Sequence, residues 1–96
     1  MDEMQNVKFL GCVNGTWKDE KTGKEVPTYT IYIGKRMLDK NGDEYGYGYK
    51  PITIKVNKDI WNEFTALDFG ADLEANIFMY KNQYNNYCYK LVGYRL

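Results

Sequence analysis

The chain has 96 residues, no histidine, and thirteen basic against thirteen acidic side chains. Its length fits one domain, residues 1–96, and the absence of histidine removes the commonest general base and the commonest metal ligand. A formal charge of zero argues against a protein that holds nucleic acid by a net basic surplus. The ten tyrosines exceed an average composition, which is typical of a binding surface, although strand propensity is an alternative explanation.

The first predicted strand runs from Val7 to Thr16, after a polar stretch at 1–6 that is expected to be a flexible lead. Alternation puts four residues on one face: Val7, Phe9, Gly11 and Val13. Gly11 and Gly15 predict a sharp bend or a bulge, as in the strands of small closed barrels.

A charged loop at 17–25 follows this strand, with a turn at Thr22-Gly23. Trp17 stands at the root of the loop. Its ring is a candidate to stack on a ligand and equally a candidate to plug the end of a barrel.

The second predicted strand runs from Val26 to Gly34 and has two unlike faces. Tyr29, Ile31 and Ile33 form the apolar face, and Thr28, Thr30 and Tyr32 form the other. We expect the first face to be buried and the second to be exposed. Lys35 and Arg36 follow directly and place two cations at the exit of the strand.

The next loop, residues 39–43, alternates oxygen-bearing side chains as a calcium loop does. Glu44 stands where such a loop needs glycine, and Lys50 stands where it needs its last carboxylate. We therefore expect no metal site here, and Asn41-Gly42 predicts a tight hairpin turn.

A third strand is predicted from Pro51 to Asn57, with Ile52, Ile54 and Val56 buried and with Thr53 and Lys55 pointing outward. If this strand extends backward in the same register, Tyr45, Tyr47 and Tyr49 join the outward face at intervals of about 7 Å. Such a row suits the bases of a stretched single strand. A tyrosine ladder against a neighbouring strand or a dimer partner is the alternative.

One helix is predicted, from about Lys58 to Leu67, with Asn57 as its N-cap and Gly70 beyond its end. Its apolar face consists of Ile60, Trp61, Phe64 and Leu67. We expect Trp61 to belong to the core, because a short helix with a wide apolar face must pack over something, such as the open end of a barrel.

The chain closes with a predicted hairpin of two strands, Leu73 to Tyr80 and Tyr87 to Leu96, joined by the polar loop 81–86. Aromatic and basic residues gather at its loop end: Phe78, Tyr80, Lys81, Tyr84, Tyr87, Tyr89 and Lys90. One small core cannot absorb so many rings, so we expect several of them to face a ligand.

Three strands, a short helix and two further strands match the all-β, five-stranded Greek-key barrel called the OB-fold, with the helix between the third and fourth strands. In that fold a groove crosses strands two and three, between the loops that join strands one to two and four to five. The residues we expect to bind nucleic acid there are Trp17, Tyr32, Lys35, Arg36, Tyr45, Tyr47, Tyr49, Lys55, Tyr80, Lys81, Tyr84, Tyr87 and Lys90.

Three segments carry a resemblance to a known family: Gly23-Lys24, the run PITIKV at 51–56, and the run LVGYRL at 91–96. The pattern from about Gly23 to Leu96 resembles the small single-stranded-DNA-binding proteins of filamentous bacteriophages and of Gram-positive phages, plasmids and other mobile elements. The resemblance implies an OB-type barrel that coats single strands by stacking and basic contacts, often as a dimer, during replication or transfer of a mobile element. No acidic tail follows the last strand, so the partner-recruiting tip of bacterial housekeeping homologues is not expected.

Cys12 and Cys88 are far apart in sequence and lack a close metal-binding spacing, so we expect free thiols in the core and no cofactor. No apolar run reaches the length of a signal peptide or a membrane span, which favours a reduced, cytoplasmic protein without membrane contact.

Two other function classes stay open at this stage. One is a protein-interaction module in which the Tyr45–Tyr49 segment is a dimer or partner interface. The other is an enzyme, but Asp39, Asp43 and Glu44 lie in a turn without a nucleophile or a phosphate-binding loop, so we expect no catalysis. RNA is a second candidate ligand beside DNA.

Overall fold

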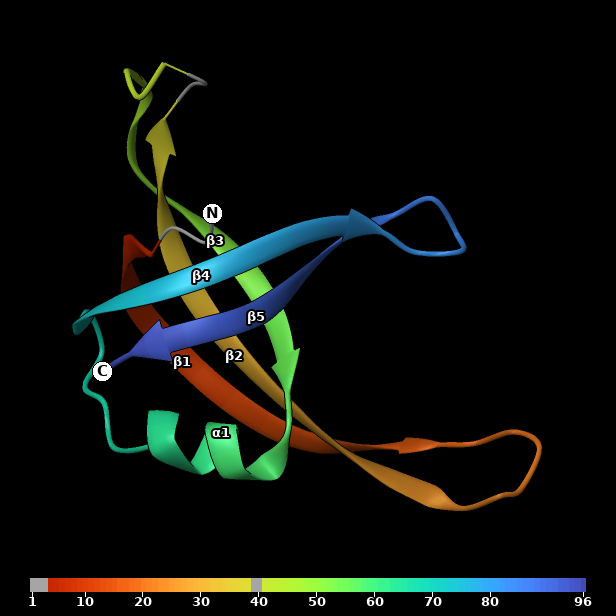
Figure 1. Ribbon diagram of the computed structural model, residues 1–96. Helices are drawn as coiled ribbons and strands as arrows, with labels where there is room; N and C mark the ends of the chain where they lie inside the picture. The colour runs from red at the N-terminus through yellow and green to blue at the C-terminus, as the bar shows by residue number, and fades with distance from the viewer. Residues whose placement is uncertain (1–3, 39–40) are drawn as a thin grey trace.

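The computed structural model describes residues 4–38 and 41–96. It contains five strands and one helix: β1 (Gln5–Lys18), β2 (Glu25–Leu38), β3 (Glu44–Val56), α1 (Lys58–Phe64), β4 (Asp72–Lys81) and β5 (Tyr87–Arg95) (Figure 1). Most strand bounds lie within a few residues of the predicted ones. β3 begins seven residues before Pro51, as expected if that strand extends backward through the tyrosines.

Residues 1–3 of the expected lead, and Asp39 and Lys40 of the expected β2–β3 turn, lie outside the described residues. Gln5 and Asn6, which were also assigned to the lead, instead pair with Ala75 and Glu74 of β4. The prediction of a flexible lead is wrong for Gln5 and Asn6, because polar side chains do not prevent a backbone from joining a sheet.

All strand pairs are antiparallel and form one sheet in the order β3-β2-β1-β4-β5. This confirms a mostly β protein with five strands and a helix between the third and fourth. The sheet is not closed, because no ladder joins β3 to β5 among the described residues. It is strongly curled, and these two edge strands approach each other on the side away from β1 (Figure 1).

The core lies inside this curl and is built from alternate residues of the strands, as a two-residue period requires. Its buried side chains are Val7, Phe9, Ile31, Ile33, Ile52, Ile54, Phe64, Leu73 and Ala75. The buried faces predicted for the second and third strands are therefore confirmed.

β1 contains a bulge at Leu10, since Phe9 pairs with Ile33 whereas Gly11 pairs with the next residue of β2, Tyr32. A bulge was expected near Gly11, but the reversal of the side-chain alternation beyond it was not expected. The extra residue reverses the alternation beyond it, so Val13 is 48% exposed and does not continue the face of Val7 and Phe9.

α1 covers the lower end of the curl in Figure 1. Asn57 is its N-cap, as predicted, and its Oδ1 accepts a hydrogen bond from the backbone N–H of Ile60 at 2.9 Å. Three ring pairs bind the helix region to the sheet: Phe9–Phe64, Tyr29–Trp61 and Phe64–Tyr94, with centroids 5.3 to 6.0 Å apart. Trp61 thus packs against the core, as expected. The helix ends three residues before Leu67, which still packs on the core.

Candidate nucleic-acid interface

The bulge in β1 creates an exposed face that spans three strands. Beyond Leu10, residues of β1 that pair with the outward residues of β2 must point outward too, and Trp17 pairs with Val26 in this way. A recess of about 550 Å³ lies on this face. Its lining is Thr16, Trp17, Val26, Thr28, Thr30 and Lys55.

A second recess, of about 880 Å³, lies between the free edge of β3 and the β4–β5 hairpin. Its lining is Lys50, Pro51, Ile52, Thr53, Lys55, Tyr80, Asn82, Tyr87, Cys88, Tyr89 and Lys90. Because β3 and β5 are the two edge strands, this recess occupies the seam at which the sheet fails to close.

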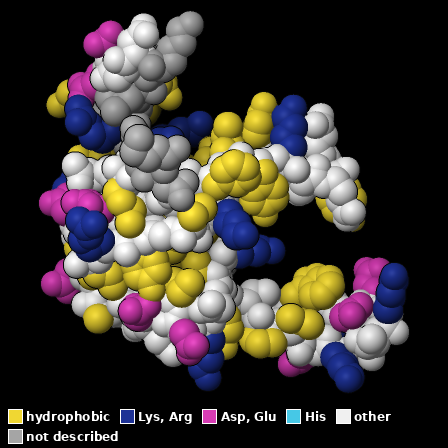
Figure 2. Space-filling view, viewed as in Figure 1, with side chains coloured by type: hydrophobic (Ala, Val, Ile, Leu, Met, Phe, Trp, Pro, Cys, Tyr) yellow, Lys and Arg dark blue, Asp and Glu magenta, His cyan; other side chains and the backbone are white. Residues whose placement is uncertain are grey.

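Lys55 lines both recesses, so its side chain borders each of them. We call the two recesses together the groove. Figure 2 shows two arms that project from the body of the molecule, each with hydrophobic side chains. Basic side chains lie where the arms leave the body. The arms are the β1–β2 and β4–β5 hairpins (Figure 1).

The groove concentrates positive charge in a chain whose formal charge is zero. Of the residues in 4–38 and 41–96, its lining includes Lys50, Lys55 and Lys90 and no aspartate or glutamate. It also includes four aromatic rings, from Trp17, Tyr80, Tyr87 and Tyr89. A positively charged trough with ring faces is chemically suited to phosphates and unpaired bases.

Asn82 organises the loop of the β4–β5 hairpin. Its Oδ1 accepts hydrogen bonds from the backbone N–H groups of Tyr84 at 2.9 Å and Asn86 at 3.0 Å. Close by, Nζ of Lys81 lies 4.9 Å from the ring centroid of Tyr87, within range of a cation–π contact. The loop therefore holds Tyr87 at the mouth of the second recess with a cation beside it.

Five of the predicted site residues line the groove: Trp17, Lys55, Tyr80, Tyr87 and Lys90. Two more lie beside it. Tyr32 pairs with Thr53 on the same outward face, and Lys81 contacts Tyr87. Tyr84 is exposed in the loop beyond and lines neither recess.

Lys35 and Arg36 do not join the groove. Lys35 pairs with the core residue Val7 and lines neither recess, although its partner in β3, Lys50, lines the second. Arg36, near the end of β2, donates a hydrogen bond to Oε1 of Glu44, the first residue of β3, and this contact raises the pKa of the guanidinium above its usual value. Adjacent positions in a strand point to opposite faces, so the pair could not act together.

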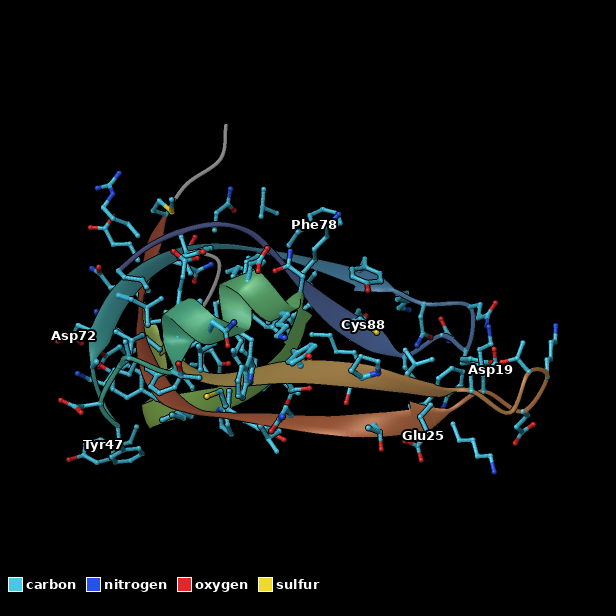
Figure 3. The ribbon with its side chains drawn as sticks, turned by 90° about the horizontal axis from the view of Figure 1, so that it is seen from below. Asp19, Glu25, Tyr47, Asp72, Phe78 and Cys88 are labelled. Carbon is cyan, nitrogen blue, oxygen red and sulfur yellow. The ribbon has the colours of Figure 1, made fainter. Side chains whose placement is uncertain are left out.

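The tyrosines at 45, 47 and 49 lie on a third hairpin, formed by β2 and β3. Tyr47 is 100% exposed, and none of the three lines either recess. Figure 3 shows Tyr47 at the opposite side of the molecule from Asp19 and Glu25, which mark the tip of the β1–β2 hairpin. The pairing of β2 with β3 jumps from Arg36–Tyr49 to Leu38–Glu44, so the tyrosine segment does not share one regular register.

Tyr49 is nevertheless anchored to the sheet. A Cβ on Gly34 would lie 3.0 Å from Cβ of Tyr49, so the absent side chain of Gly34 makes room for it. Nζ of Lys8 lies 5.7 Å from the centroid of the same ring and donates a hydrogen bond to Asp72 at 2.7 Å.

Several lining residues were not among the predicted site residues, mainly Lys50, Thr53, Asn82, Thr28 and Thr30. The outward position of the three threonines was visible in the alternation of β2 and β3. Lys50 and Asn82 gave no such signal, because their place depends on how the two sheet edges approach each other.

Both cysteines are free, as predicted. Cys12 packs against the core, but Cys88 lines the second recess and is not a core thiol. Among residues 4–38 and 41–96 there is no cluster of three or more histidine, cysteine, aspartate or glutamate side chains that could hold a metal ion. Within the described chain, no helix has the length and apolar character needed to cross a bilayer.

Comparisons with known protein families, with curated proteins and with solved structures found no match.

Proposed function

We propose that this protein binds single-stranded DNA in the groove. The observation that carries the proposal is that two neighbouring recesses share Lys55 in their lining and that, among the described residues, this lining contains lysines and aromatic rings but no carboxylate. In a chain of zero formal charge, this gathering of lysines and aromatic rings at one groove favours a polyanionic ligand that also has flat rings.

We also propose that the curled sheet is an OB-type fold. The strand order β3-β2-β1-β4-β5, the helix between β3 and β4 and the bulge in β1 support it. In such a fold the ligand lies between the β1–β2 and β4–β5 hairpins, which is where the groove lies.

The binding energy would come mainly from stacking. Each stacked base contributes roughly 1–3 kcal/mol, so Trp17, Tyr80 and Tyr87 together would outweigh the electrostatic term. Lys50, Lys55 and Lys90 would neutralise about three phosphates, which predicts a shallow slope of about −2 for log K against log salt concentration. Sequence preference would be weak, because every base has a face to stack.

Fluorescence titration tests the proposal. Oligothymidine of about 16 nucleotides, a duplex of equal length and oligouridine are added separately to the protein at several salt concentrations. We expect single strands to quench the emission of Trp17 at micromolar concentrations and the duplex to have a much weaker effect. Unchanged emission and anisotropy with the single strands would refute the proposal, and stronger binding of oligouridine would identify RNA as the ligand.

A second candidate function is a protein interface at the β2–β3 hairpin. The observation in its favour is the full exposure of Tyr47, on a hairpin that does not line the groove. Light scattering of the wild type and of a Tyr45→Ser, Tyr47→Ser, Tyr49→Ser variant tests it. A dimer that dissociates in the variant, with oligothymidine affinity unchanged, would establish this second role. Reduced affinity with an unchanged mass would assign the tyrosines to the nucleic acid instead.

A further inference from the structure

Phe78 presents an exposed ring that the core does not explain. β4 runs past the core, so that Leu73 and Ala75 near its start are buried whereas Phe78 is 57% exposed. Figure 3 shows Phe78 on the outer side of the β4 ribbon, away from the helix. The sequence-derived site did not include this residue.

Two neighbours of Phe78 on this face, Tyr80 and Lys90, belong to the groove. The ring of Tyr80 lies 6.3 Å from that of Phe78, centroid to centroid, and the two planes differ by 15°. Lys90 pairs directly with Phe78 across the β4–β5 ladder. Since Tyr80 and Lys90 both line the second recess, Phe78 continues that recess onto the outer face of the hairpin.

The spacing of the two rings fits successive bases of an extended strand. Stacked bases in B-DNA rise by about 3.4 Å, so rings 6.3 Å apart would suit a single strand stretched to nearly twice that rise. A cation beside the outer ring would be placed for the phosphate that links the two nucleotides.

We infer that the bound single strand leaves the second recess over Tyr80 and continues onto Phe78, where the next base stacks while Lys90 contacts the backbone phosphate. This inference rests on the proposed function and extends its binding site by one nucleotide subsite. The occupant is the same strand because the subsite is continuous with the groove and carries the same positive charge.

Phe69 provides a matched control. It is 82% exposed and lies between α1 and β4, next to Asp68, and it lines neither recess. Single exposed apolar residues of this kind are common on protein surfaces. Replacing Phe69 therefore removes an exposed ring without touching the inferred subsite.

The experiment measures fluorescence anisotropy of labelled oligothymidines from about 4 to about 16 nucleotides, with the wild type, Phe78→Leu, Phe78→Tyr and Phe69→Leu. We expect Phe78→Leu to weaken binding of the longest oligonucleotide by about 5-fold to 150-fold and to leave the shortest nearly unaffected. Phe78→Tyr should restore affinity, because the ring is kept, and Phe69→Leu should match the wild type. Thermal unfolding of each variant confirms that the fold is intact.

Two outcomes would overturn the inference. Equal affinities of Phe78→Leu and Phe69→Leu at every length would show that no base stacks on Phe78, while wild-type binding would leave the proposed function standing. A self-association that is lost in Phe78→Leu, with affinity unchanged, would assign the ring to a second copy of the chain. Failure of the wild type to bind any oligothymidine would instead refute the proposed function itself.

Discussion

The hydroxyl of Tyr94 in β5 donates a hydrogen bond to Oε2 of Glu63 in α1. The ring of Tyr94 also lies 5.3 Å from that of Phe64, so one side chain joins the last strand to the helix by both a polar and an apolar contact. The hydrogen bond to Glu63, followed by burial, raises the pKa of Tyr94 to about 12 from its usual value of 10.0.

This shift predicts a loss of stability in strong alkali. Below pH 10 the hydroxyl is protonated in both the folded and the unfolded chain, so its contribution is fully present. Between pH 10 and about 12 the unfolded chain loses the proton first, and the free energy of unfolding falls. Tyr94→Phe should cost about 0.5–1.5 kcal/mol at pH 7, and the difference from wild type should shrink as pH rises through this window.

Urea unfolding at pH 7 to about 12 measures this difference, and Tyr47→Phe is the control because that ring is fully exposed on another hairpin. If the difference in free energy of unfolding between wild type and Tyr94→Phe stays constant across the alkaline range, the raised pKa of Tyr94 is contradicted.

The second prediction concerns Gly34, the buried glycine of β2. Gly34→Ala would bring a methyl group to 3.0 Å from Cβ of Tyr49, a contact to rigid atoms of a packed side chain. We expect this overpacking to lower the free energy of unfolding by about 1–3 kcal/mol.

Gly93→Ala in β5 is the matched control, since among the described residues the new Cβ would meet only Cε of Met4, at 3.7 Å. Reduced conformational freedom of the unfolded chain should make that change neutral or slightly stabilising. Chemical denaturation of both variants tests the pair, and equal stabilities would be evidence against the close approach of Tyr49 to Gly34.

The third prediction concerns Lys55, which lines both recesses. Lys55→Met keeps much of the side-chain length and removes the charge. If the groove binds single strands, affinity should fall by a similar factor for all sequences and the salt slope should decrease by about 0.7.

Lys21→Met, in the charged turn between β1 and β2, serves as the comparison because Lys21 lines neither recess. Titrations with oligothymidine at several salt concentrations give both slopes. Equal slopes in the two variants would remove Lys55 from the binding surface.

The fourth prediction separates the two roles considered for Trp17, as a stacking ring and as a plug. The ring is 57% exposed and lines the first recess, so we expect Trp17→Ala to leave stability within about 1 kcal/mol of wild type. The free energy of oligothymidine binding should weaken by roughly 1–3 kcal/mol in Trp17→Ala. Trp17→Phe should keep part of the wild-type affinity, because a ring remains. Isothermal calorimetry together with thermal unfolding distinguishes the roles. A large loss of stability with unchanged affinity would favour the plug.

Much of the fold was predictable because local patterns are strong in this chain. Ile31 and Ile33 alternate with threonine and tyrosine, so β2 and its buried face follow from a two-residue period. Asn57 has the side-chain acceptor that an N-cap requires, and its contact with Ile60 is present. Each of these features depends only on residues close together in sequence.

The groove itself was only partly predictable, for reasons that particular residues make clear. Trp17 points to the outward face because Leu10 is an extra residue in β1, and a bulge can be suspected from a glycine but not located by it. Tyr45 and Tyr47 were expected beside the groove because they precede Lys55 in the same strand, yet the pairing of β2 with β3 carries them to another hairpin.

By itself, the sequence determined the number of strands, the position of the helix, the buried faces of β2 and β3, and the unusual supply of tyrosine. The tertiary structure decided which aromatic and basic side chains share a surface. The physical reason is that strand periodicity is a local property, whereas the register between strands and the approach of β3 to β5 depend on packing between residues far apart in the chain. The shared place of Lys55 in two recesses is one result of that packing.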